Sequence, residues 1–202
     1  TALMLVQQTP RENYKVVYSF QLEADASLPA MAAADVGTQR LQPDVKIFAL
    51  RPDALALDYG DVLLKGETSA FFKFFDTVDD SLIASIGFEA KQSRLAAIPD
   101  IASMTFSTLV GAGDVIPMVT NDSGAIVAVY LNETETVQPT EPGAVINAEG
   151  AVKSLSGVSS TTKGTLATYG DQLLFYVPSG SSDQKIRLIG WASALIAAKE
   201  LS

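Results

Sequence analysis

Residues 69–98, with the sequence SAFFKFFDTVDDSLIASIGFEAKQSRLAAI, are the stretch that most constrains the fold of this chain. Its apolar side chains recur at steps of four and three residues, at Phe71, Phe75, Val78, Leu82 and Ile86. That spacing places them on one face of an α-helix. Gly66 before the stretch and Pro99 after it are typical helix boundaries, and Gly87 is a point where the helix can break. We therefore predict one long helix here, on which a curved sheet closes.

Most of the remaining chain has the alternating pattern of β-strands. The expected strands cover residues 2–7, 16–22, 104–110, 115–119, 125–137, 165–169, 172–177 and 185–191. The first two pair as a hairpin, and the Ala-rich tail 192–201 continues as strand, with a helix as the alternative. Residues 125–137 are apolar on both faces at first, which is typical of a strand in the middle of a sheet. A second helix is expected from Pro52 to Gly66, and a helical turn at residues 152–157.

These elements predict an α+β fold, with a long helix packed on a curved, mainly antiparallel sheet. A cone-shaped, cystatin-like or NTF2-like arrangement fits this order, and a sheet with helices on one flank in another topology is the alternative. Residues 1–43 are a strand hairpin and a connection, either the end of an upstream domain or an extension of the sheet. Residues 44–202 form the α+β domain. Because the chain opens within a strand and without Met, we expect it to be a piece of a longer protein.

Composition excludes several classes of site. The chain has 202 residues, no cysteine and no histidine, and a formal net charge of −9. Disulfides, thiolate nucleophiles and thiolate metal sites are therefore excluded, as are histidine bases and histidine metal ligands. The acidic charge argues against nucleic acid and anionic lipid as partners. The longest apolar runs are too short to cross a bilayer. We expect no cofactor.

Two groups of carboxylates are candidates for chemistry. Asp76, Asp79 and Asp80 are spaced to lie together on the predicted helix, as a hard-cation site, an acid pair or a solvated acidic face. Glu133 and Glu135 share a strand face and are followed by Glu141, an arrangement that allows a glycosidase-like pair. We interpret both groups as exposed surface acids. No residue is assigned a catalytic, cofactor-binding or metal-ligating role.

Three other features are interpreted as structural. Gly111 and Gly113 lack the context of a dinucleotide-binding loop and predict a turn. The aromatic residues Phe71, Phe72, Phe74 and Phe75 are expected to fill the core, with two rings lining a pocket as the alternative. Trp191, the one indole, is expected in the core or at its rim.

Several segments together resemble a known family. They are residues 8–20 (QTPRENYKVVYSF), residues 59–63 (YGDVL) followed by Ser69 and the Phe-rich stretch, residues 175–178 (FYVP) and residues 185–191. The chain resembles a family of actinobacterial extracytoplasmic proteins and lipoproteins of unknown function, some of them labelled glycosyl hydrolase. In that family the similar region follows another N-terminal segment, and no catalytic residues can be carried over. The resemblance implies an envelope location and a binding or structural role.

We therefore expect a non-catalytic extracytoplasmic domain, secreted or attached to the cell envelope at the outer face of the cytoplasmic membrane. Its partner would be a protein, an envelope polymer or a small apolar ligand, held at the mouth of the cone or on an exposed sheet face. Any membrane attachment would come through an anchor outside this chain. The alternative is a carboxylate-based glycoside hydrolase or a sugar-binding domain, and we favour a protein without enzymatic activity.

Overall fold

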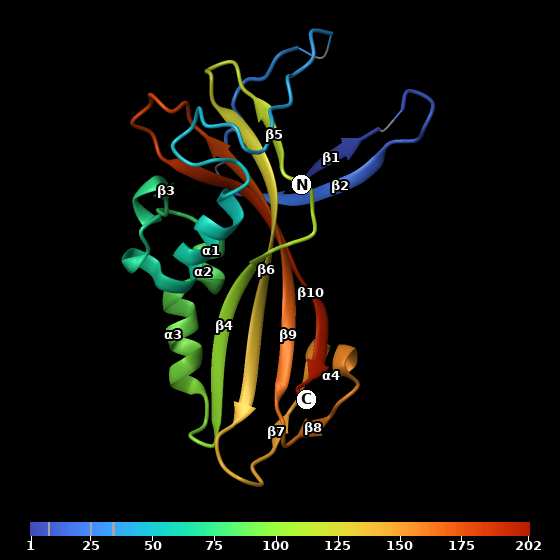
Figure 1. Ribbon diagram of the computed structural model, residues 1–202, viewed down its shortest axis with the longest axis vertical. Coiled ribbons are helices and arrows are strands. Elements are labelled where there is room, and N and C mark those ends of the chain that lie inside the picture. Colours follow the sequence, from blue (N-terminus) through green and yellow to red (C-terminus); the bar gives the residue numbers. More distant parts are fainter. Residues whose placement is uncertain (8, 25, 34) are drawn as a thin grey trace.

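Three long strands form the centre of the molecule. The computed structural model describes residues 1–7, 9–24, 26–33 and 35–202. β6 (Ala125–Pro139), β9 (Thr165–Val177) and β10 (Ile186–Glu200) lie side by side and run through most of its length (Figure 1). The sheet has the order β1-β2-β10-β9-β6-β4, with β3 added on β10 and β5 on β6. Its pairs are antiparallel apart from the parallel β3–β10 pair, so the α+β class and the mainly antiparallel sheet are confirmed.

The other elements are shorter. The strands are β1 (Ala2–Val6), β2 (Lys15–Leu22), β3 (Phe75–Asp76), β4 (Ala102–Val110), β5 (Ile116–Val119), β7 (Ile146–Asn147) and β8 (Ser160–Thr161). The α-helices are α1 (Leu55–Lys65), α2 (Ser81–Ile86), α3 (Phe88–Ala97) and α4 (Gly150–Ser156), and the 3-10 turns are η1 (Gly66–Thr68) and η2 (Phe72–Phe74). Within the described residues, every helix is too short or too polar to span a lipid bilayer.

The helices α1, α2 and α3 cover one face of the sheet (Figure 1). Tyr59 of α1 is fully buried, and its ring meets the rings of Phe75 and Phe175 at centroid distances of 5.3 and 5.1 Å. The sheet contributes the alternate apolar residues of β6 and β9 to this core. The predicted burial of residues 125–137 and the predicted helix ending at Gly66 are confirmed.

The opposite face of the sheet carries a second, smaller core. Tyr18 and Phe20 of β2 stack with a centroid distance of 5.5 Å. They pack over the start of β6, the end of β9 and the start of β10. Next to them, the Tyr130 ring lies against Gly111 and Gly113, where an added Cβ atom would fall 1.8 Å and 3.3 Å from the nearest ring atoms. The predicted turn at these glycines is confirmed, and the absence of a side chain at both glycines makes room for the ring.

The long helix predicted for residues 69–98 is wrong. Phe75 belongs to strand β3, and Val78, expected on the buried stripe, is 76% exposed. Asp79 has a left-handed backbone with φ of 59°, and Asp80 then caps the N-terminus of α2 by accepting from the backbone N–H of Ile83. Two short helices therefore replace the long one.

Two other expectations about strands have opposite outcomes. The predicted interruption at Gly170 and Asp171 is wrong, because β9 runs through both residues without a break. The prediction that the tail continues as strand is confirmed by β10, which pairs with β9 as far as Glu200.

Candidate functional site

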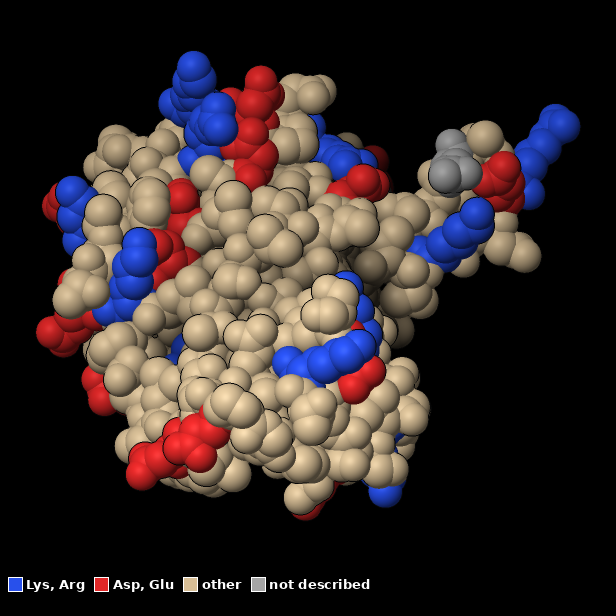
Figure 2. Space-filling model, turned by 60° about the horizontal axis from the view of Figure 1, so that its bottom comes forward, with Lys and Arg blue, Asp and Glu red and all other residues tan. Residues whose placement is uncertain are grey.

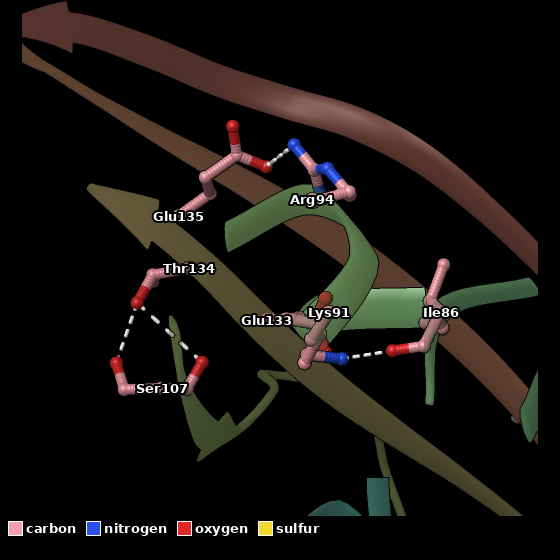
Figure 3. A network of polar contacts seen from close by, with 7 residues as sticks. All are labelled: Ile86, Lys91, Arg94, Ser107, Glu133, Thr134 and Glu135. Carbon is pink, nitrogen blue, oxygen red and sulfur yellow. Dashed lines mark hydrogen bonds and ion pairs between the residues drawn. The ribbon is translucent and has the colours of Figure 1, made fainter. Parts of the chain in front are cut away.

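A network of charged side chains joins α3 to the sheet (Figure 3). The Nζ atom of Lys91 lies 2.8 Å from Oε2 of Glu133, and both side chains are more than nine-tenths buried. Lys91 also donates to the backbone carbonyl of Ile86, at the end of α2. One turn further along α3, Arg94 donates to Glu135 with an Nη2–Oε2 distance of 2.5 Å.

These contacts dominate the underside of α3. Of the ten described residues of α3, Lys91 alone is buried. The Phe106 ring of β4 lies beneath both cations, 5.4 Å from the Lys91 ammonium and 5.2 Å from the Arg94 guanidinium. Such contacts add cation–π attraction to the two ion pairs. The helix is therefore held largely by charge.

Asp171 lies close to this network and is buried without a well-formed hydrogen bond among the described residues. It stands opposite Leu131 in the β6–β9 ladder and opposite Ser193 in the β9–β10 ladder. The residue is fully buried, and within the described part of the chain neither carboxylate oxygen makes a hydrogen bond of normal geometry. Burial raises the pKa of Asp171 to about 6, more than the nearby Ser193 hydroxyl and the Lys91 charge lower it.

Glu133 is therefore not the exposed acid that we expected. Burial raises its pKa, against the opposing effect of Lys91. Glu133 and Glu135 do share a strand face, but Glu141 lies apart, in an exposed loop. Sequence reasoning missed Lys91 and Asp171; the one available signal was an aspartate within the alternating strand pattern of residues 165–177.

The second acidic group is not on a helix and is not uniformly solvated. Asp80 is buried, and both of its carboxylate oxygens accept from the hydroxyl of Tyr59, at 2.8 and 3.0 Å. Burial raises the pKa of Asp80. Asp76, Asp79 and Asp80 line a small cavity of about 150 Å³ together with Arg187. Across the described ranges, no group of three or more acidic side chains is placed to hold a metal ion.

The aromatic stretch contributes to both the core and the surface. Phe75 is buried as expected. Phe72 is half-buried and, with Phe88, lines an open cavity of about 460 Å³ between α1, α2 and α3. Phe72 is the one ring of the four-residue aromatic stretch that lines this cavity, so the alternative in which two of those rings line a pocket is not met here. Trp191 lies at the rim of the core and donates its indole N–H to Ser81 at 2.8 Å.

The hairpin of β1 and β2 carries several exposed apolar side chains. It projects from the body, as Figures 1 and 2 show. We call its solvent-facing apolar residues, Leu3, Leu5, Tyr14, Val16 and Val17, the hairpin patch; each is between 38% and 66% exposed. β1 is an edge strand that pairs only with β2 among the described strands.

Comparison with known proteins identifies the family but no function. A family model described as a domain of unknown function, DUF8094, matches residues 1–200. No curated protein and no solved structure matches the chain. The cystatin-like or NTF2-like arrangement and the actinobacterial lipoprotein origin therefore stay predictions. The match covers nearly the whole chain, and the chain belongs to the DUF8094 family, a domain of unknown function.

Proposed function

We propose that this chain is a non-catalytic binding domain that works outside the cytoplasmic membrane and takes up an extended segment of a partner protein along β1. The observation that carries the proposal is the hairpin patch beside the outer edge of β1, where no described strand pairs. The location rests on the resemblance to extracytoplasmic proteins, since the absence of cysteine fits either side of the membrane.

The edge of β1 offers both affinity and selectivity to an added strand. Its outer N–H and C=O groups have no neighbouring strand in the described structure, and such groups pair readily with another chain. Leu3 and Leu5 alternate along β1 and are 58% and 50% exposed, so they present one apolar face beside that edge. β1 contains neither a charged residue nor a proline, the usual protections of an edge strand. Strand addition uses this combination, with backbone bonds for affinity and alternate side chains for selectivity.

Charge favours a foreign partner over a second copy. The hairpin carries Arg11 and Lys15 against the single acid Glu12, in a chain whose net charge is −9. Figure 2 shows basic and acidic side chains near the end of the projection. Two copies would bring two strongly acidic bodies together, which like charge opposes. A segment with alternating apolar residues and flanking acids fits the hairpin better.

The alternative, a carboxylate-based hydrolase, has one point in its favour. Glu133 and Asp171 have raised pKa values, and a general acid needs a raised pKa. Both carboxylates are however closed beneath α3, with Asp171 fully buried. A glycan bound on the surface of this structure does not reach them. The buried pair therefore supports a binding domain better than a hydrolase.

The test uses a displayed library of random ten-residue peptides selected on the purified protein, with binding of the recovered peptides measured by fluorescence polarisation. We expect alternating apolar sequences that lose at least tenfold in affinity for Leu3→Ser/Leu5→Ser. The matched control is Leu109→Ser, which removes an equally exposed leucine from β4 and should bind normally. Methylating alternate peptide amides should abolish binding in one register and spare it in the other.

Three results would overturn this proposal. They are a library without binders, binders unaffected by the two hairpin substitutions, and a parent protein that light scattering shows to be a dimer dissolved by the same substitutions.

The location has its own test. Protease added to intact cells of the source organism should degrade the protein, and degradation that requires lysis would contradict an extracytoplasmic site.

A further inference from the structure

We infer that α3 is a pH-dependent clamp, held on the sheet by its ion pairs to Glu133 and Glu135 and loosened when Asp171 beneath it ionises. This inference is independent of the hairpin and of the function proposed for it. It rests on the two ion pairs shown in Figure 3, of which Lys91–Glu133 is buried and Arg94–Glu135 partly exposed, and on the buried Asp171 near Lys91 and Glu133.

The contact between α3 and the sheet is poorly filled by apolar side chains. A surface cavity of about 300 Å³ is lined by Leu95 of α3 and by Met104 and Phe106 of β4. The close contacts are instead Lys91 with Glu133 and Arg94 with Glu135. Because few apolar contacts hold the helix, changes in the buried charge can decide whether it stays docked.

The buried charges do not balance when every acid is ionised. Lys91 faces two carboxylates, Glu133 and Asp171, and the Arg94–Glu135 pair beside them is neutral as a whole. The other titratable groups that face the cluster are the phenols Tyr169 of β9 and Tyr59 of α1, which are uncharged near neutral pH. β4 faces it with Phe106 and Thr108, and β10 with Ser193.

One excess negative charge therefore lies in the interior above pH 6. Burial disfavours such a charge, and detaching α3, which carries Lys91, would let water reach Asp171. Below pH 6 the carboxyl is protonated, and Lys91 and Glu133 remain as a balanced pair. The clamp is then tighter at pH 5 than at pH 8.

The sign of the pH dependence follows from linkage. Asp171 has a pKa of about 6 when α3 is docked, and its pKa returns to the ordinary value of 3.8 when α3 opens and exposes it. Between these values the docked state binds more protons than the open state. Raising the pH therefore favours opening, by about tenfold in the opening equilibrium between pH 5 and pH 8.

Hydrogen exchange of the α3 amides at pH 5 and pH 8, expressed as protection factors, tests the clamp. We expect α3 protection in the parent to fall about tenfold at pH 8, while protection of α1 changes little. Asp171→Asn should keep α3 protected at both pH values. Arg94→Gln should lower α3 protection at both, whereas Arg51→Gln, which removes the exposed pair with Asp53, should not change it.

Three outcomes would overturn the inference: α3 protection independent of pH in the parent, an equal fall in α1, or an unchanged pH dependence in Asp171→Asn. If Asp171→Asn does not fold, Arg94→Gln decides, because α3 protection equal to that of the parent would show that the ion pair does not hold the helix.

Discussion

Replacing Phe75 by alanine tests how the helical layer is fixed to the sheet. The Phe75 side chain is 1% exposed and packs edge-on against Tyr59, with a second ring, Phe175, at 5.9 Å. Emptying a buried phenylalanine site removes about 3 to 5 kcal/mol of unfolding free energy, including the cavity left behind. The two ring contacts, each about 0.5 to 1.5 kcal/mol, place the expected loss in the upper half of that range.

Phe74, the adjacent residue, is the matched control. Its ring is half-buried at the edge of the same core, with the Lys73 ammonium 4.9 Å from its centroid. We expect Phe74→Ala to cost about 1 kcal/mol, since less apolar area leaves water there. Urea unfolding followed by the fluorescence of Trp191 measures both variants. A loss below 1 kcal/mol for Phe75→Ala, or equal losses for the two, would refute the placement of Phe75 in β3.

Three further predictions concern buried acids. Asp171→Asn should raise the free energy of unfolding by up to about 3 kcal/mol at pH 8 and by little at pH 4, because the parent loses stability as pH rises through the raised pKa of about 6; urea titrations at both pH values measure this. Tyr59→Phe should cost about 1 to 3 kcal/mol at pH 7, because the buried Asp80 carboxylate loses its hydroxyl donor; an unchanged urea midpoint would contradict that bond. Aryl-glycoside and cell-wall glycan substrates should show no turnover; activity lost in folded Glu133→Gln or Asp80→Asn would contradict the non-catalytic proposal.

The sequence was most informative where local pattern and tertiary position agree. The helix ending at Gly66 and the strand of residues 125–137 both follow from their apolar spacing, and the structure has both. Strand β10 was likewise predicted from alternation that continues into an Ala-rich tail. In each case the residues that share one apolar spacing lie on one continuous helix or strand and are buried together.

The predicted long helix failed because its apolar residues are buried by different elements. Phe75 enters the core from a strand and Leu82 from α2, so a shared spacing of three and four does not mean a shared helix. Asp80 before Ser81 is an N-cap pattern that marks the start of α2 locally. The apolar spacing from Phe71 to Ile86 is the stronger pattern, and it conceals this N-cap signal.

The charged network could not be predicted, because its members come from distant parts of the chain. Lys91 and Glu133 meet only when α3 lies over β6, and the burial of Asp171 requires the whole sheet and the helices above it. Charged side chains are seldom fully buried, so an acid in the sequence is read as exposed by default. Glu133 and Asp80 depart from that default for different reasons, one paired with a lysine and the other with a tyrosine hydroxyl.

Hydrogen exchange of the protein with and without a selected peptide tests the proposed binding edge most directly. The account predicts new protection at the β1 amides that face away from β2, with residues 102–110 at the other edge of the main sheet unchanged. Protection that appears instead around the cavity lined by Phe72 and Phe88, with none in β1, would contradict strand addition at the hairpin.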